Sequence, residues 1–339
     1  MPTLLLTGAT GFVGSQLVPD LRRAGWVVRA AVRSGGVALP DGVEPVVVGD
    51  LAAAPDLRGG FAGIETVVHL AGRAHVMRET ASDTEAAFRG ANVDATRHLA
   101  RQAVAAGARR FVFLSSVKVH GERTADRPFI DTDPPAPEDA YGRSKWAAEQ
   151  ALHEIATATG LEVVVIRPPL VYGPGVKANF LRLLRLVERG VPLPLASVRN
   201  RRSLVGVWNL CDLIVAATSH PAAAGRAFLV SDQHDLSTPD LVRAIAAAMG
   251  RPARLYPCPV AILRVAARAI GQAAAVDRLV DSLQVDSGEA GRRLGWVPKV
   301  GVEEGLRCRL GRVQQRRLQR RGDQRLQVAA ADLRVRVLG

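Results

Sequence analysis

Short apolar runs alternate with longer amphipathic segments along the first half of the chain. The runs lie at 4–7, 27–32, 46–48, 66–70, 111–114 and 162–166. The longest amphipathic segments lie at 12–24, 83–106 and 139–159, and each ends just before a glycine. Runs that are apolar at nearly every position are typical of strands buried on both faces, and the segments between them predict helices.

Strands and helices that alternate in this way predict an α/β protein with a parallel sheet covered on both faces. Because crossover connections between parallel strands are right-handed, the expected fold is a Rossmann-type doubly wound sheet. In such a sheet the ligand crevice lies at the carboxyl ends of the strands.

The pattern changes after Arg167-Pro168-Pro169, where proline and glycine become frequent. We expect a dinucleotide-binding domain over 1–174 and a smaller substrate-binding lobe over 175–306, with a strand near 227–230 returning to the sheet. A helix is expected behind Ser237-Thr238-Pro239, with Thr238 as its cap and Pro239 at its first position.

The net charge of +13 is concentrated at the end of the 339-residue chain. Ten arginines and two aspartates lie from Arg307 onward, and only four of the 45 basic residues are lysines. We interpret 307–339 as a disordered extension or as sequence that is not native to the fold; a basic membrane-surface segment is the alternative. Aromatic residues make up 4% and do not interleave with the basic residues, so nucleic-acid binding is not expected.

Three scattered cysteines, Cys211, Cys258 and Cys308, predict neither a disulfide framework nor a metal site. No leader peptide is expected, and the most apolar long segment, 260–276, is interrupted by Arg264 and Arg268. A cytoplasmic protein without a transmembrane segment is therefore predicted.

A glycine-rich turn follows the first strand, with Gly8, Gly11 and Gly14 spaced three residues apart. At a strand-to-helix junction this spacing predicts a site for a dinucleotide diphosphate, which the free N–H groups of the helix N-terminus would bind. Arg33 stands after the second strand, where an acidic residue usually binds the ribose of NAD, and this favours NADP modestly. Asp50, after the third strand, could accept a hydrogen bond from the adenine amino group.

Tyr141 and Lys145 are four residues apart on a predicted helix and therefore share one face. A nearby ammonium group favours the phenolate, so we expect the pKa of Tyr141 to be lowered and the phenol to act as a general acid or base. Ser115-Ser116 ends the strand at 111–114, which places a hydroxyl group at the same crevice.

These motifs, with His69-Leu70-Ala71-Gly72, Asn92 and 167–175, resemble the extended short-chain dehydrogenase/reductases, in the branch of nucleotide-sugar epimerases. The resemblance covers about residues 3–306. It implies Ser116, Tyr141 and Lys145 as catalytic residues, and NAD or NADP as the cofactor. The implied cofactor-binding residues are Gly8, Thr10, Gly11, Phe12, Val13, Gly14, Arg33, Asp50, Leu51, Leu70, Ala71, Gly72, Asn92, Tyr141, Lys145 and Pro168.

The resemblance also implies a UDP-sugar substrate, bound by Ser116, Lys118, Asn179 and Arg202, although Arg199 and Arg201 lie near Arg202. Dehydratases of this family carry Asp-Glu where Val117-Lys118 stands, so loss of water is not expected. His120 replaces a usual tyrosine and Trp208-Asn209 a usual carboxylate, and His120 could line the pocket or be structural.

The leading hypothesis is a UDP-hexose 4-epimerase that works through a transient 4-keto sugar. An NADPH-dependent reductase of a UDP-4-keto-6-deoxy sugar would use the same residues, and a non-catalytic regulator that senses the nucleotide is the third possibility. The resemblance further implies a homodimer formed through the helices at 83–106 and 139–159.

Overall fold

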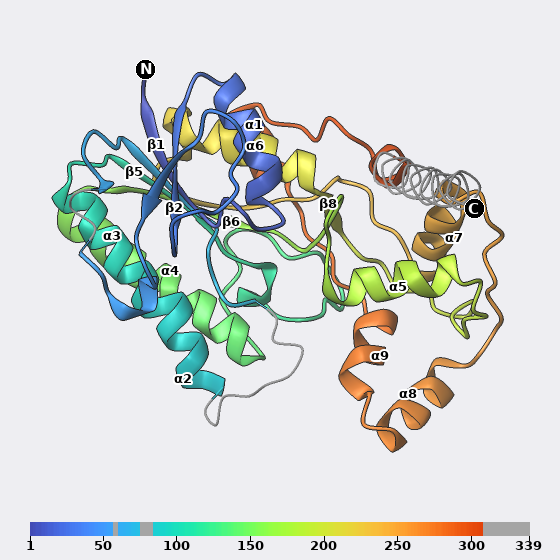
Figure 1. Cartoon of the computed structure of the whole chain (residues 1–339). Coiled ribbons are helices and arrows are strands. Elements are labelled where there is room, and N and C mark those ends of the chain that lie inside the picture. Colours follow the sequence, from blue (N-terminus) through green and yellow to red (C-terminus); the bar gives the residue numbers. More distant parts are fainter. Residues whose placement is uncertain (57–59, 75–83, 308–339) are drawn as a thin grey trace, which may run out of the picture.

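A seven-stranded parallel sheet with the strand order β3-β2-β1-β4-β5-β6-β9 is the centre of the computed structural model, which describes residues 1–56, 60–74 and 84–307 (Figure 1). The strands are β1 (Thr3–Thr7), β2 (Val27–Val32), β3 (Glu44–Val47), β4 (Thr66–His69), β5 (Arg110–Leu114), β6 (Glu162–Arg167) and β9 (Arg226–Leu229). This is the predicted Rossmann-type fold, and each predicted strand is confirmed to within two residues at its ends.

Helices cover both faces of the sheet because alternate side chains of each buried strand point to opposite sides (Figure 1). On β1, Leu4 and Leu6 pack in one core with α1 (Gly14–Arg23) and α6 (Val207–Ser219). Leu5 packs in the other core with α3 (Ala95–Ala105) and α4 (Ala140–Thr159). The central strands are therefore covered on both faces, and the ends of the strands are where a ligand site can form.

The long helix predicted at 83–106 is interrupted within the described residues, which begin again at Thr84. It comprises α2 (Thr84–Phe88), a π-helical segment η3 (Arg89–Asp94) and α3. π-Helical turns inside helices are found frequently at functional sites. This one contains Asn92.

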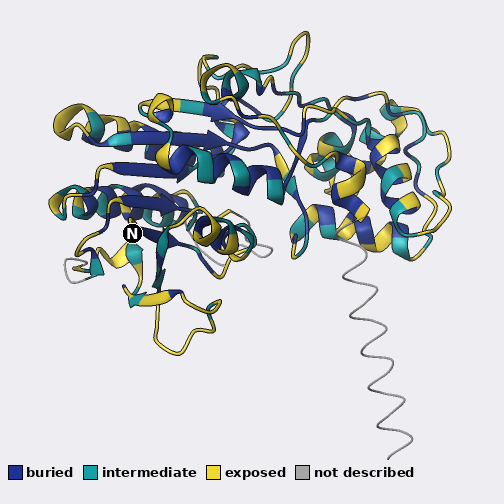
Figure 2. Cartoon of the chain, turned by 90° about the horizontal axis from the view of Figure 1, so that it is seen from above, coloured by how far each residue is buried: buried dark blue, intermediate teal, exposed yellow. Residues whose placement is uncertain are grey.

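A second group of elements lies beside the carboxyl ends of the strands (Figure 2). It consists of the two-stranded parallel sheet β7 (Leu170–Tyr172) and β8 (Leu204–Gly206) with α5 (Ala178–Glu188), α7 (Thr238–Ala248), α8 (Val260–Ala269) and α9 (Ala273–Val280). These elements share a core of their own around Tyr172 and Phe180. Short segments complete the chain: η1 (Leu51–Ala53), η4 (Val117–Val119), η5 (Pro221–Ala223) and α10 (Gly288–Leu294).

The predicted cap of α7 is wrong by one residue. Ser237 is the N-cap, and its hydroxyl accepts a hydrogen bond from the N–H of Asp240. Thr238 is buried and donates its hydroxyl proton to the carbonyl of Leu279 instead. Tertiary contact thus decides which of two neighbouring hydroxyl residues caps the helix.

Across the described residues, no helix combines the length and the apolar character that a membrane span requires. The basic tail predicted at 307–339 lies outside the described residues beyond Arg307.

Gly14, the first residue of α1, lies against the turn that follows β1. A Cβ atom at this position would approach the Gly8 carbonyl oxygen to 2.2 Å and the Ala9 Cα to 2.8 Å. Both neighbours are backbone atoms, so they cannot move aside as a flexible side chain would.

We therefore expect Gly14→Ala to push α1 away from β1, to lower the free energy of unfolding by about 1–3 kcal/mol and to weaken dinucleotide binding. Denaturant unfolding and a cofactor titration measure the two effects. Gly301→Ala is the matched control, because a Cβ there would meet no atom within 4 Å. An unchanged unfolding midpoint in Gly14→Ala would contradict the close approach.

Candidate active site

The glycine-rich turn forms an open cradle between β1 and α1. Gly8 has φ 74°, a conformation that glycine adopts without strain, and a Cβ on it would lie 3.0 Å from the Ala71 nitrogen. Gly11 closes the turn by donating its N–H to the Gly8 carbonyl, at 2.9 Å. The bare backbone at the N-terminus of α1 fits the diphosphate of a dinucleotide, as the sequence predicted.

A relay of hydrogen bonds connects this turn to the π-helical segment. The Thr96 hydroxyl donates to the Asn92 carbonyl at 2.6 Å, and a hydroxyl has a single proton, so it accepts from His69 Nε2 at 3.0 Å. His69 Nδ1 is then the acceptor for the Thr7 hydroxyl at 2.7 Å, and Thr7 accepts the N–H of Ala71 at 3.1 Å. One neutral tautomer of His69 satisfies every member of the relay.

Burial lowers the pKa of His69 to about 3, and the charge of Lys145 lowers it further. The histidine therefore stays neutral at physiological pH. Its constant hydrogen-bonding pattern holds the glycine-rich turn and the Asn92 segment in one arrangement.

Asn92 and Lys145 meet at Gly72. The Asn92 side chain donates to the Ser144 hydroxyl at 2.9 Å and accepts the N–H of Arg73 at 2.7 Å. A Cβ on Gly72 would lie 3.0 Å from Asn92 Oδ1 and 3.3 Å from Lys145 Nζ. Glycine at position 72 therefore leaves open the space that both side chains border.

Lys145 is buried on α4, one turn after Tyr141. Its ammonium group donates to the Leu114 carbonyl at 2.8 Å and lies 4.5 Å from the centroid of the Phe113 ring. Burial lowers the pKa of Lys145 to about 8, although the Glu149 carboxylate opposes the shift.

Tyr141 lies in the first turn of α4, where a hydrogen bond joins it to Ser116. Burial raises the pKa of the phenol to about 12; the bond to Ser116 lowers it, and the carboxylate of Asp139 raises it. The expectation that Lys145 alone lowers this pKa is therefore wrong for the protein without cofactor. The reason is that burial dominates, while the Lys145 ammonium group donates to the Leu114 carbonyl.

A buried ion pair fixes α4 against the end of β6. Arg167 donates to both carboxylate oxygens of Glu149, at 3.1 and 2.5 Å, and the two side chains are only 8% and 4% exposed. The Ser115 hydroxyl donates to the same carboxylate. The strand that delivers Ser116 and the helix that delivers Tyr141 are thus held by one charged group.

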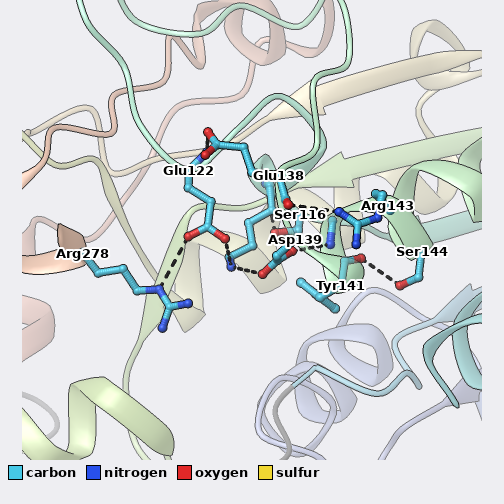
Figure 3. A network of polar contacts seen from close by, with 10 residues as sticks. Ser116, Glu122, Glu138, Asp139, Tyr141, Arg143, Ser144 and Arg278 are labelled. Atoms are coloured by element: carbon cyan, nitrogen blue, oxygen red, sulfur yellow. Dashed lines mark hydrogen bonds and ion pairs between the residues drawn. The ribbon is translucent and has the colours of Figure 1, made fainter. Parts of the chain in front are cut away.

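A second network surrounds the start of α4 (Figure 3). Asp139 caps the helix by accepting the Gly142 N–H at 2.7 Å, and its other oxygen accepts from Lys118 at 2.5 Å. Lys118 also donates to Glu122 at 2.7 Å, and Arg278 of α9 lies 3.6 Å from the second oxygen of Glu122. Burial raises the pKa of Asp139, but the bonds from Lys118 and Gly142 outweigh it and hold that pKa below its ordinary value.

With this geometry in place, the comparison with known families is informative. The model of the NAD dependent epimerase/dehydratase family matches residues 4–231. The chain belongs to this family.

Relatives of this family member include a UDP-glucose 4-epimerase of Vibrio cholerae, which is 44% identical over 308 residues, covering 90% of this chain and 93% of the relative. An N-acetyl-alpha-D-glucosaminyl-diphospho-ditrans,octacis-undecaprenol 4-epimerase of Escherichia coli O157:H7 is 27% identical and covers 77% of both chains. Among solved structures, MoeE5 in complex with UDP-glucose and NAD superposes with a TM-score of 0.74 at 28% identity, covering 92% of this chain and 99% of that one.

In this epimerase/dehydratase chain, the structure brings together Ser116, Tyr141, Lys145, Asn92 and Gly72. The remaining predicted cofactor residues lie at strand ends along the same edge of the sheet: Thr10, Phe12 and Val13 after β1, Arg33 after β2, Asp50 and Leu51 after β3, Leu70 and Ala71 after β4, and Pro168 after β6. Arg33 is exposed, and Asp50 caps η1 through the N–H of Ala52.

The predicted substrate residues are divided between two places. Of the three neighbouring arginines, Arg199 and Arg201 are exposed, whereas Arg202 is half-buried and donates to the Asp281 carbonyl at 2.9 Å. Burial lowers the pKa of Arg202, while the nearby charge of Asp281 raises it; the charges of Arg278 and Glu122 act on it more weakly. Asn179 is exposed at the start of α5, and in the described part of the chain it forms no hydrogen bond to that network.

The two departures from the family pattern have structural roles. His120 is buried, stacks on Phe129 and contacts Arg167 at 2.9 Å, and burial lowers its pKa to about 4. Asn209 donates to the buried Asp232 at 2.7 Å and accepts the N–H groups of Lys299 and Val300. A carboxylate is therefore present beside residue 209, but it comes from Asp232.

Three contributors to the site were not predicted as site residues: His69, Glu149 and Asp139. Thr7 and His69 are partners in the register of β1 and β4, so polar residues at the ends of two neighbouring strands were an available signal. Glu149 follows Lys145 by four residues on one helical face, and Asp139 stands three residues before Gly142, as a helix cap does.

His69 makes stability depend on pH. Its pKa is about 3 in the folded protein and 6.5 in an exposed imidazole, so the unfolded chain takes up the proton first as the pH falls. The contribution of the neutral His69 to the free energy of unfolding is complete above pH 6.5 and is lost as the pH falls toward 3. At pH 5 the expected loss is about 2 kcal/mol.

Chemical unfolding at several pH values should therefore show a weaker dependence on pH between 6.5 and 5 in His69→Gln, whose amide can still accept from Thr7 and donate to Thr96. His153→Gln, at an exposed position of α4, is the control and should keep the wild-type slope. Equal slopes in wild type and His69→Gln would refute a neutral buried histidine.

Proposed function

We propose that this chain is a UDP-hexose 4-epimerase that uses NAD or NADP and works through a transient 4-keto sugar. The observation that carries the proposal is the pairing of Ser116 with Tyr141 at a crevice that also holds a glycine-rich cradle. The similarity to the UDP-glucose 4-epimerase of Vibrio cholerae over nine-tenths of the chain supports the hexose substrate.

The residues of the chain divide the chemistry between them. Tyr141 takes the proton of the 4-hydroxyl group and later returns it, while Ser116 holds the reacting oxygen by a hydrogen bond. Lys145 and Asn92 border the opening at Gly72 and would hold the nicotinamide end of the cofactor there. When bound, the cofactor supplies a reversible hydride acceptor, so the sugar can be oxidised at C4 and reduced again on its other face.

The high pKa of Tyr141 makes proton removal depend on cofactor binding. A positive charge close to a phenol lowers its pKa, and the oxidised nicotinamide ring carries such a charge. A bound oxidised nicotinamide would therefore bring the pKa of Tyr141 down from about 12 and favour its action as a base.

Lys118 disfavours the elimination of water that dehydratases catalyse. The position that provides an acidic group in dehydratases is occupied here by an ammonium group, which two carboxylates neutralise. A reductase of a 4-keto sugar would use the same tyrosine and serine but would consume reduced cofactor. Arg33, exposed after β2, is the one feature that favours NADPH.

The test is incubation of the purified protein with NAD and UDP-glucose or UDP-N-acetylglucosamine. We expect interconversion with the corresponding galacto sugar and no net change in the absorbance of reduced nicotinamide. In Tyr141→Phe, kcat should fall about 10²- to 10⁴-fold because the proton carrier is lost, whereas cofactor binding should persist.

Tyr256→Phe is the matched control, since it removes a phenol hydroxyl from a half-exposed position outside the crevice and should keep full activity. Net consumption of NADPH with a 4-keto sugar, without interconversion, would replace the epimerase by the reductase. Full cellular function of Tyr141→Phe would favour the non-catalytic regulator.

We propose that the group formed by α5, α7, α8 and α9 is the substrate-binding lobe at 175–306 and that it binds the UDP part of the substrate. Arg202 supports this assignment, because a half-buried guanidinium group suits a diphosphate. Asn179, at the N-terminus of α5, would contact the same phosphates.

We further propose a homodimer formed through α3 and α4, which lie side by side on one face of the sheet (Figure 1). Sedimentation equilibrium of the purified protein should give twice the chain mass of 36.1 kDa. A mass of 36.1 kDa at micromolar concentration would rule the dimer out.

A further inference from the structure

Helix α8 is apolar on two opposite faces, although it lies on the surface. Its inner face packs on the core of the second group of elements through Val260, Leu263 and the fully covered Ala267. Its outer face presents Ile262 and Val265, which are 58% and 66% exposed, together with exposed alanines at 261, 266 and 269. An ordinary surface helix carries polar residues on that side, so this face is built for contact with something other than water.

The apolar face extends beyond the helix at both ends. Ile270, directly after α8, is 72% exposed, and Tyr256, before it, is 47% exposed. Figure 1 shows α8 at the edge of the molecule, away from the large sheet, so the face protrudes and is not the wall of a groove. A protruding apolar helix flanked by an aromatic residue suits a planar apolar phase.

The charges around this face are mostly positive. Between residues 251 and 281 the chain has five arginines and two aspartates, a net charge of +3. Arg264 and Arg268 follow one another by one helical turn along the border of the apolar face, and Arg264 pairs with Asp281 and Asp277 while Arg268 is exposed. A positive border favours an anionic surface.

Two other occupants fit less well. A symmetric contact between two copies would bring the arginines of both copies together, which like charges oppose. The second alternative is the segment of the chain beyond Arg307. It contains nine arginines and two aspartates, so repulsion between like charges opposes its binding to this face.

We propose that the outer face of α8 docks the protein onto an anionic lipid bilayer. Ile262, Val265 and Ile270 enter the boundary between headgroups and acyl chains, and Arg268 lies among the anionic headgroups. The helix lies along the surface and does not span it. This inference is independent of the proposed function, because it rests on α8 alone.

A series of polar contacts connects α8 to the start of the catalytic helix. Helix α9 follows α8 directly, and the two helices are joined by the ion pair between Arg264 and Asp277. Arg278 of α9 contacts Glu122, which binds Lys118 beside the start of the catalytic helix α4 (Figure 3).

The test is flotation of the full-length protein with vesicles of phosphatidylglycerol and phosphatidylcholine, compared with vesicles of phosphatidylcholine alone. We expect binding to the anionic vesicles only. The combined variant Ile262→Ser, Val265→Ser and Ile270→Ser should lower the bound-to-free ratio at least about tenfold. Arg268→Gln should lower it about fivefold, and added salt should reduce this difference.

Val47→Ser combined with Val297→Ser is the matched control, since these side chains are 60% and 59% exposed elsewhere on the surface, and it should bind as the wild type does.

Equal flotation of the wild type and the triple variant would overturn the proposal and assign any binding to another part of the chain. Absence of vesicle binding together with a smaller mass of the triple variant would overturn it in favour of contact between copies. Equal binding to both kinds of vesicle would overturn the role of the anionic surface. If the triple variant has a lower melting temperature than the wild type, its loss of binding is not used as evidence. The proposal is then kept only if Arg268→Gln lowers binding to the anionic vesicles and added salt reduces the difference, and it is overturned if Arg268→Gln binds as the wild type does.

Discussion

The buried ion pair between Arg167 and Glu149 is the contact on which the geometry of the active site depends. It joins the carboxyl end of β6 to the middle of α4, and Ser115 at the end of β5 donates to the same carboxylate. Removal of one partner from such a pair typically costs about 3–5 kcal/mol, because the other charge is left buried and unpaired. The positions of Ser116, Tyr141 and Lys145 relative to one another therefore depend on the Glu149–Arg167 ion pair.

The cofactor side of the crevice is organised by neutral groups. The Thr7–His69–Thr96 relay satisfies each of its members with one tautomer and connects the glycine-rich turn to the π-helical segment at Asn92. Close packing of Gly8 and Gly14 against backbone atoms completes this side. A rigid polar frame of this kind keeps donors in place for a ligand at little further cost in entropy.

The same structure separates chemistry from recognition. The proposed proton transfer involves Tyr141 and Ser116, and burial raises the pKa of the Tyr141 phenol to about 12. The proposed recognition of the substrate involves Arg202 and Lys118, and the charged network of Lys118, Glu122 and Arg278 links the start of α4 to α9. Through α9 this network is connected to α8, because Asp277 of α9 pairs with Arg264.

The sequence by itself determined the order of strands and helices, the glycine-rich turn and the pairing of Tyr141 with Lys145, because each depends on residues close together in the chain. It favoured Arg202 among three neighbouring arginines, and it favoured Thr238 as the cap of α7, where the structure has Ser237. Only the tertiary structure decided those choices, the π-helical segment at Asn92 and the pKa of Tyr141. The physical reason is that burial and long-range hydrogen bonds, which local patterns do not encode, set which side chain turns inward and which charge is stable there.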